Sequence, residues 1–139
     1  MPVHVTGYAH VRLTVSDIGR SRAFYEQVFG LPVAFEVPVD ADDETREALS
    51  FLFGGVIFVI GEGLMGLRPV APAGDRFSED RVGLDHVSLL VPSVAELENA
   101  VEVLDGMGVE HGPIKDLGRA SILEFRDPDG IALELTAPH

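Results

Sequence analysis

The sequence of 139 residues contains no cysteine. This absence excludes disulfide bonds, thiolate nucleophiles and metal sites built from thiolates. Any bound metal ion would therefore need histidine and carboxylate ligands. The length fits one compact domain, and a chain of this size buries enough surface for a hydrophobic core. The hydrophobic fraction of 46% indicates a folded chain rather than a disordered one.

Basic residues are also scarce. Lys and Arg number 10 against 23 Asp and Glu, which gives a formal net charge of −13. Such a charge repels phosphate backbones and anionic lipids, so neither nucleic acid nor a membrane surface is expected as a partner. The longest unbroken apolar run, residues 56–60, is too short to cross a bilayer, and the first residues lack the regions of a signal peptide. We expect a cytoplasmic protein.

The chain repeats itself. GYAHVRLTV at residues 7–15 resembles GLDHVSLLV at residues 83–91, with Gly, His, Val, Leu and Val recurring at an offset of 76 residues, from residue 7 to residue 83. The same offset relates Gly30 to Gly106. Such self-similarity predicts two copies of one structural unit. We therefore expect one domain, residues 1–139, made of two modules at about residues 5–70 and 83–137, with the breaker-rich segment 71–82 as linker.

Each module has the same predicted plan of strand, helix and three strands. Apolar residues alternate over residues 8–15, which predicts a strand, and a helical period follows from about Asp17 until Gly30 ends it. In the second module Ser93 and Glu96 form a capping box, and Gly106 is the expected helix end. The remaining strands are predicted at 31–38, 47–53 and 56–60, and at 108–115, 119–126 and 130–136; residues 64–70 are ambiguous and could form the last strand of the first module.

Three side chains stand out as candidates for chemistry. His10 and His86 occupy equivalent positions on the more polar face of each first strand, and Glu134 lies within an otherwise apolar last strand. A carboxylate there costs stability unless it is paired or bound. Taken singly, each could be a packed histidine or a solvated glutamate. Together, two imidazoles and one carboxylate form a known ligand set for divalent metals that leaves open positions for water and substrate.

Four motifs carry a resemblance to a known family: residues 7–17, 21–31, 83–91 and 125–135. As a set they resemble the vicinal oxygen chelate superfamily, which includes glyoxalase I, methylmalonyl-CoA epimerase, fosfomycin-resistance proteins, extradiol dioxygenases and bleomycin-resistance proteins. The resemblance implies an α+β fold in which two βαβββ modules form an open, cup-like barrel around a metal site. It places the ligands on first and last strands, at His10, His86 and Glu134. The implied cofactor is one divalent ion, Fe, Mn, Ni, Co or Zn.

A fourth ligand is harder to find. Glyoxalase I and methylmalonyl-CoA epimerase have Glu or Gln on the last strand of the first module. Aligning Gly55 with Gly130 puts Val59 opposite Glu134. Aligning the prolines at 69 and 138 puts Met65 there instead. Both are apolar, so the position is filled either by Glu62 in another register or by water, and we expect three protein ligands.

The resemblance leaves several functions open. The first is a metal-dependent enzyme that binds vicinal oxygens of a small molecule and performs isomerase or lyase chemistry through an enolate or oxyanion. Its catalytic base is either Glu134 or a metal-bound water. The second is an extradiol-type dioxygenase, although residues 118–125 lack the His and Tyr that such enzymes place near the metal. The third is an antibiotic-binding resistance protein without catalysis, which the acidity fits and the triad does not. His111 begins a turn-rich stretch and is a weak catalytic candidate. The family also implies a homodimer.

Overall fold

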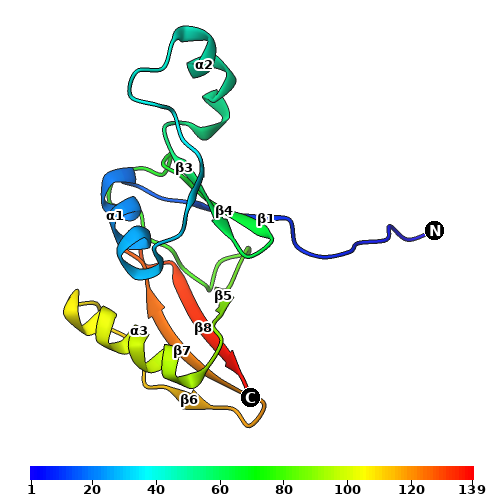
Figure 1. Ribbon diagram of the computed structural model, residues 1–139, viewed down its shortest axis with the longest axis vertical. Helices are drawn as coiled ribbons and strands as arrows, with labels where there is room; N and C mark the ends of the chain where they lie inside the picture. The colour runs from blue at the N-terminus through cyan, green and yellow to red at the C-terminus, as the bar shows by residue number, and fades with distance from the viewer. The chain divides into compact units, whose positions relative to one another are not determined.

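The computed structural model describes residues 1–139, which divide into two compact units, Met1–Gly74 and Asp75–His139. Each unit has one four-stranded mixed sheet and one long helix (Figure 1). Each unit thus has a βαβββ strand plan, which confirms the α+β class and the paired modules predicted from the repeat. The units are described separately below.

The first unit builds its sheet in the order β1-β4-β3-β2. β1 and β4 run parallel, and the other neighbouring pairs are antiparallel. The elements are β1 (His10–Thr14), α1 (Ile18–Phe29), β2 (Val33–Phe35), α2 (Asp43–Ala48), the 3-10 helix η1 (Ser50–Leu52), β3 (Val56–Ile60) and β4 (Gly63–Arg68). The predicted ambiguous stretch 64–70 is therefore the last strand of this module, β4.

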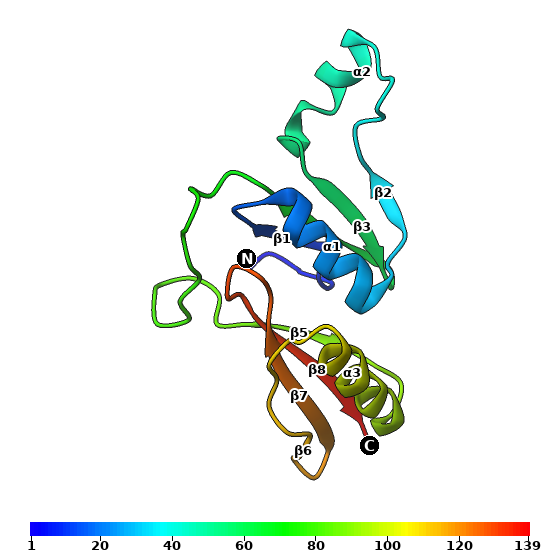
Figure 2. The ribbon, with the colours of Figure 1, turned by 90° about the vertical axis from the view of Figure 1, so that its left-hand side faces the viewer.

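Helix α1 forms where the sequence predicts it. The Asp17 side chain caps the first turn by accepting a 3.0 Å hydrogen bond from the backbone N–H of Arg20. Gly30 ends the helix in the left-handed conformation, with φ of 58°, a position that glycine adopts without steric cost. Phe24 and Tyr25 are buried on the side that packs against the sheet. Figure 2 shows α1 lying across the strands of its unit.

The predicted strand at 47–53 is wrong. Residues 43–48 form α2 and residues 50–52 form η1. The Asp42 carboxylate accepts a 2.8 Å hydrogen bond from the backbone N–H of Thr45 and so caps α2. Acidic residues in the first turn and Arg46 in the last complement the helix dipole. These local charges favour a helix over the strand that the apolar residues from Leu49 onward suggested.

The second unit builds its sheet in the order β5-β8-β7-β6, with β5 and β8 parallel and the other pairs antiparallel. Its helix packs on β7 and β8. The elements are β5 (Val87–Leu90), α3 (Val94–Gly106), β6 (Lys115–Asp116), β7 (Ala120–Arg126) and β8 (Ala132–Pro138). The strand order repeats that of the first unit.

Two details of the second unit differ from the prediction. Ser93 caps α3 as expected, but the helix includes Gly106 and has its C-cap at Met107, and Gly108 takes the left-handed conformation with φ of 70°. The strand predicted at 108–115 is reduced to β6 and one bridge between His111 and Phe125. Proline at position 113 offers no N–H for a sheet ladder, which interrupts the expected strand.

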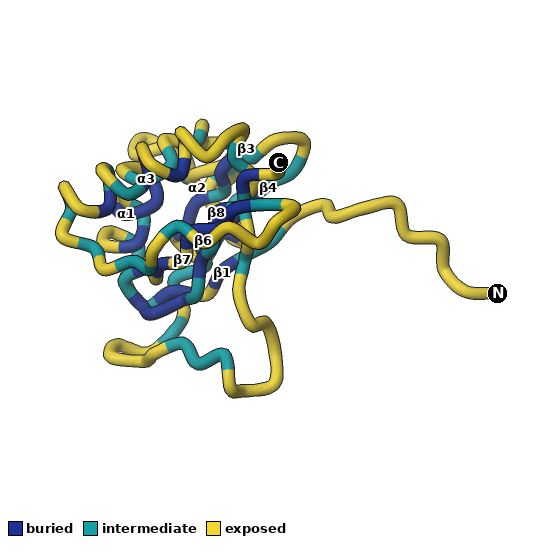
Figure 3. The backbone as a smooth tube through the Cα atoms, turned by 90° about the horizontal axis from the view of Figure 1, so that it is seen from below, coloured by how far each residue is buried: buried dark blue, intermediate teal, exposed yellow.

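The core of each unit lies between its helix and the covered face of its sheet. Burial alternates along β8, where Leu133, Leu135 and Ala137 are buried while Glu134 and Thr136 are partly exposed. Figure 3 colours the backbone, including β8, by how far each residue is buried. This period of two places the polar residues on the face that the helix leaves uncovered. No helix of the chain is long and apolar enough to span a membrane.

Candidate metal centre

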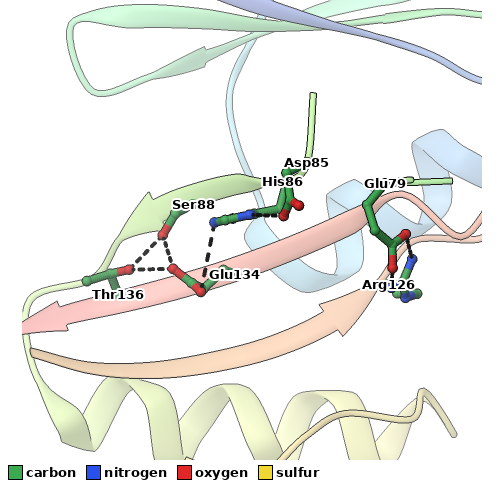
Figure 4. Close-up of polar contacts among 7 residues, drawn as sticks. All are labelled: Glu79, Asp85, His86, Ser88, Arg126, Glu134 and Thr136. Carbon is green, nitrogen blue, oxygen red and sulfur yellow. Dashed lines mark hydrogen bonds and ion pairs between the residues drawn. The ribbon is translucent and has the colours of Figure 1, made fainter. Parts of the chain in front are cut away.

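The sheet of the second unit brings His86 and Glu134 together. His86 directly precedes β5, and Glu134 lies on the neighbouring parallel strand β8, where it pairs with Ser88. The Nε2 atom of His86 lies 4.0 Å from Oε2 of Glu134 (Figure 4). The His86 side chain is 44% exposed and that of Glu134 is 14% exposed, so the imidazole is accessible while the carboxylate is largely enclosed. A separation of this size leaves the two atoms facing each other without a direct hydrogen bond.

Asp85 fixes the other side of the imidazole. Its Oδ1 atom lies 2.6 Å from Nδ1 of His86. Because an ionised carboxylate only accepts, Nδ1 carries the hydrogen and Nε2 has the free lone pair in the neutral ring. Asp85 and, to a smaller extent, the charge of Glu134 raise the pKa of His86, whereas burial opposes the shift. A carboxylate behind a ligating imidazole is the usual support of a metal-bound histidine.

Two hydroxyls hold the second oxygen of Glu134. Ser88 Oγ donates to Oε1 at 2.8 Å, and Ser88 Oγ lies 2.6 Å from Oγ1 of Thr136. Since the Ser88 hydrogen goes to Glu134, Thr136 is the donor in the shorter contact, and it shares its hydrogen with Oε1 at 3.2 Å. Oε1 is therefore engaged, and Oε2 is the oxygen that faces His86. Figure 4 shows the three side chains on adjacent strands.

A cavity of about 600 Å³ opens beside this pair within the second unit. Two of its acids are neutralised by neighbours: Glu79 by Arg126 at 2.6 Å, and Glu124 by Lys115 at 2.8 Å. Arg126 lowers the pKa of Glu79 to about 2 by its hydrogen bonds. The lining residues are Glu79, Asp85, His86, Glu110, His111, Gly112, Glu124, Phe125, Arg126, Ala132, Leu133 and Glu134.

His111 also lines the cavity, but both of its ring nitrogens are engaged. Nδ1 lies 2.6 Å from the carbonyl oxygen of Gly112, and Nε2 lies 2.8 Å from Oδ1 of Asp105. Both partners accept hydrogen bonds, so the ring satisfies both only as the doubly protonated imidazolium. The Gly112 carbonyl first, and then Asp105, raise the pKa of His111. These contacts give His111 a role in joining α3 to the following segment.

His10 lies in the first unit, as the first residue of β1. It pairs with Leu64 on β4 and shares the uncovered sheet face with Arg12 and Thr14. Its side chain is exposed. Within each unit taken alone, no group of three or more His, Asp or Glu side chains is arranged to hold a metal ion.

The strand ladders identify the true counterpart of Glu134 in the first unit. The offset of 76 residues makes Arg12 the equivalent of Ser88. Ser88 pairs with Glu134, and Arg12 pairs with Gly66. The position opposite Glu134 is therefore Gly66, which has no side chain.

Both alignments proposed from the sequence are corrected by this register. Val59 lies on β3, not on the last strand, and Met65 is buried at 1% exposure on the opposite face of β4. Glu62 is exposed in the turn before β4 and lies outside the strand. A carboxylate equivalent to Glu134 is thus absent from β4. The stem of Arg12 lies over the vacant position, since a Cβ atom at Gly66 would come within 3.1 Å of the Arg12 Cγ atom.

Two supporting residues escaped the sequence analysis. Asp85 had a visible signal, because it directly precedes the repeated histidine, but its contact with Nδ1 depends on the backbone geometry ahead of β5. The alternation of β8 indicated that Thr136 lies on the same strand face as Glu134. Its hydrogen bond to Ser88 depends on the parallel pairing of β5 and β8, which the alternation does not reveal.

Known proteins share this architecture. A family model described as Glyoxalase/Bleomycin resistance protein/Dioxygenase superfamily matches residues 7–135. No curated protein shows a significant match. Among solved structures, a glyoxylase/bleomycin resistance protein/dioxygenase domain from Frankia sp. EAN1pec has 28% sequence identity and a TM-score of 0.76, over 98% of this chain and 94% of that chain.

Two further solved structures share the fold at lower identity. A variant of the fosfomycin resistance protein FosX from Listeria monocytogenes, complexed with Mn(II) and 1S,2S-dihydroxypropylphosphonic acid, is 18% identical with a TM-score of 0.71, over 98% of this chain and 95% of that chain. Lactoylglutathione lyase from Agrobacterium tumefaciens is 18% identical with a TM-score of 0.68, over 96% of this chain and 94% of that chain. With the family match over residues 7–135, the resemblance to the vicinal oxygen chelate superfamily is confirmed, and the chain belongs to the glyoxalase/bleomycin resistance protein/dioxygenase superfamily.

Proposed function

We propose that this protein is a metal-dependent enzyme of the glyoxalase type, in which His10, His86 and Glu134 hold one divalent ion. Its substrate is a small molecule with two neighbouring oxygens. The reaction is an isomerisation or elimination that passes through an enolate or oxyanion of the substrate. The observation that carries this proposal is the supported pair of His86 Nε2 and Glu134 Oε2, 4.0 Å apart.

The donor set of this pair fits a divalent metal. Asp85 leaves a free lone pair on Nε2 of His86, and the two hydroxyls on Oε1 leave Oε2 of Glu134 as the available carboxylate oxygen. Imidazole and carboxylate ligands suit Fe, Mn, Ni, Co and Zn, and thiolate-dependent metals are excluded by the absence of cysteine. The free oxygen Oε2 of this enclosed carboxylate needs a partner, which either a protonated His86 or a bound divalent ion would supply.

The side chains of the site have separate tasks. A divalent ion bound there acts as a Lewis acid that stabilises negative charge on substrate oxygens. Glu134 would contribute Oε2 to the ion, and we assign Oε2, once it is released from the ion, as the acceptor for a proton taken from the substrate. Ser88 and Thr136 keep the carboxylate from rotating, and Asp85 keeps the imidazole in one tautomer. These supports favour a preorganised site, which is the main source of electrostatic catalysis.

Two solved structures with the same fold are compatible with this proposal. FosX has been solved with Mn(II), and the Agrobacterium protein is a lactoylglutathione lyase. The cavity lining does not support the dioxygenase alternative. Its one further histidine, His111, has both ring nitrogens engaged in hydrogen bonds and is not available to transfer protons. An isomerase or lyase activity is therefore the stronger proposal.

We further propose that the two units form a single domain with one shared site and that the protein is a homodimer. His10 belongs to the first unit, and His86 and Glu134 belong to the second. The three ligands can meet within one chain or between two copies that exchange modules.

Metal content tests the proposal directly. Wild type and the variants His10→Ala, His86→Ala and Glu134→Ala are purified without an affinity tag, supplied with Mn, Fe, Ni, Co or Zn and measured by mass spectrometry. We expect about one ion per site in wild type and a loss in every variant. His4→Ala, at an exposed position outside the strands, is the matched control and retains the metal. A folded wild type that takes up none of these ions would overturn the proposal and move attention to binding of cationic antibiotics.

Mixing variants then distinguishes the two arrangements. Co-refolded His10→Ala and His86→Ala chains form mixed dimers. Exchanged modules would place both altered residues in one site and leave the other site intact, so metal binding returns in part. Ligands that meet within one chain leave every site defective, and the mixture stays metal-free.

A further inference from the structure

The uncovered sheet face of the first unit carries two arginines and no acid on its strands. Arg12 lies on β1, and Arg68 lies on β4, where it pairs with Thr14. The strand residues on this face are His10, Arg12, Thr14, Phe35, Ile57, Val59, Leu64, Gly66 and Arg68. In a chain with a formal charge of −13, a cationic face without acids is unexpected. The equivalent face of the second unit carries Glu124 and Glu134.

Neither arginine has an acidic partner. Arg12 donates from Nη2 to the carbonyl oxygen of Phe51, and the guanidinium of Arg68 lies 4.4 Å from the ring centroid of Phe53. By contrast, Arg22 pairs with glutamates at 2.7 Å. Lys115 and Arg126 also pair with glutamates, whereas Arg46 and Arg76, like Arg12, donate to backbone carbonyls.

One atom of Arg12 is left unsatisfied. Its Nε–H is buried and has no hydrogen-bond partner. A buried donor without an acceptor is destabilising, and the loss is larger for a charged group. The contact with Phe51 therefore accounts for only part of the guanidinium. A planar guanidinium whose donors are not all engaged can donate two hydrogen bonds to a carboxylate or phosphonate.

The position of Arg12 connects it to the proposed metal. Arg12 and His10 are two residues apart on one strand face, which separates their backbones by about 7 Å. A small molecule spans this distance. The stem of Arg12 lies over Gly66, the position equivalent to Glu134. At the position equivalent to Glu134 the first unit therefore has the aliphatic stem of an arginine in place of a carboxylate.

We propose that Arg12, supported by Arg68, binds an anionic oxygen group of the substrate, a carboxylate or a phosphonate, while the neighbouring oxygens of that substrate reach the metal. This inference rests on the proposed function and names its substrate class. Small 2-oxo acids, 2-hydroxy acids and phosphonates have the required chemistry. Neutral vicinal diols and hydroxyketones lack the group that Arg12 binds.

Isothermal titration with defined probes tests the proposal. Oxalate supplies vicinal carboxylate oxygens, phosphonoformate supplies a phosphonate, and hydroxyacetone supplies neutral vicinal oxygens. On Mn(II)-loaded protein we expect Arg12→Met to lower the affinity for oxalate, phosphonoformate or both by about 10- to 100-fold. The affinity for hydroxyacetone should stay unchanged. The anion that loses more identifies the group. Arg119→Met changes the net charge equally at an exposed turn and should leave all three affinities unchanged.

The design separates this inference from the proposed function. The metal content of wild type is measured first. If the protein binds no metal, this result refutes the metal site but not the role of Arg12. Anion binding is then titrated on the metal-free chain, where a lower anion affinity of Arg12→Met still supports that role. Equal anion affinities in wild type and Arg12→Met overturn the inference. Since Arg12 also contacts Phe51, Arg12→Lys provides a second variant: it keeps the charge and should retain part of the affinity even if Arg12→Met folds poorly.

Discussion

The hydroxyl of Ser88 donates a 2.8 Å hydrogen bond to Oε1 of Glu134 across the parallel pairing of β5 and β8. Replacing Ser88 by alanine removes this donor and leaves Oε1 of Glu134 with only the longer hydrogen bond from Thr136, at 3.2 Å. Loss of a residue that supports a ligand typically reduces metal affinity by about 10- to 100-fold. We expect a decrease of this size for Ser88→Ala, measured by titration of Mn(II) or Zn(II) in competition with a fluorescent chelator.

A matched serine elsewhere separates support of the ligand from general destabilisation. Ser93→Ala removes the N-cap of α3 and should lower the free energy of unfolding by about 1 kcal/mol without changing metal affinity. If Ser88→Ala and Ser93→Ala bind metal equally well, the hydrogen bond from Ser88 does not position Glu134.

Gly66 is expected to resist substitution because Arg12 lies over it. A Cβ atom at this position would lie 3.1 Å from Cγ of Arg12 and 3.3 Å from Cγ1 of Ile57. We predict that Gly66→Ala lowers the free energy of unfolding by about 1 to 3 kcal/mol, the usual range for overpacking. Urea unfolding of a double-mutant cycle with Arg12→Ala checks the cause. The loss should be smaller in the Arg12→Ala background, and strictly additive effects would contradict the steric explanation.

The repeat made the modules and two of the three proposed ligands visible in the sequence. His10 and His86 stand at one offset, and the helical period from about Asp17 and the capping box at Ser93 correctly predicted where both long helices begin. These signals are local or periodic, so a single sequence contains them. The βαβββ plan of each unit followed from the same signals.

Register and short elements could not be predicted in this way. Glycine at position 66 faces Arg12 because β4 pairs in parallel with β1, and no spacing within β4 reveals its partner. The sequence alignments therefore selected Val59 or Met65. The error at residues 47–53 has another cause: Asp42 and its acidic neighbours stabilise a short helix that outweighs the apolar pattern after it.

His111 should make stability depend on pH in the neutral range. Gly112 and Asp105 raise its pKa in the folded state above the ordinary value of 6.5. A raised pKa means that the folded state holds this proton more tightly, so the stabilisation is complete below the unfolded pKa and disappears as pH rises through the folded value. His111→Gln should therefore lose more stability relative to wild type at pH 5.5 than at pH 9.

Urea unfolding of metal-free protein at both values measures this difference. His4→Gln is the matched control, since His4 lies in the exposed segment before β1. A deficit of His111→Gln that is the same at both pH values would mean that packing, not the proton, explains the contribution of the residue.

The ion pair of Glu79 and Arg126 should govern part of the acid sensitivity of the second unit. Arg126 contacts both carboxylate oxygens of Glu79, at 2.6 and 3.0 Å, and lowers the pKa of Glu79 from 4.5 to about 2. A depressed pKa gives stability that is present above the unfolded value and is lost as pH falls through the folded value. Between pH 5 and pH 2, wild type should therefore lose more stability than Glu79→Gln, and the free energies of unfolding of the two proteins should converge near pH 2.

Unfolding in urea across this range measures how the free energy of unfolding depends on pH. Glu98→Gln on α3 is the control, because its carboxylate has no ion pair. Parallel curves for wild type and Glu79→Gln would show that solvent screens the pair, because both side chains are substantially exposed.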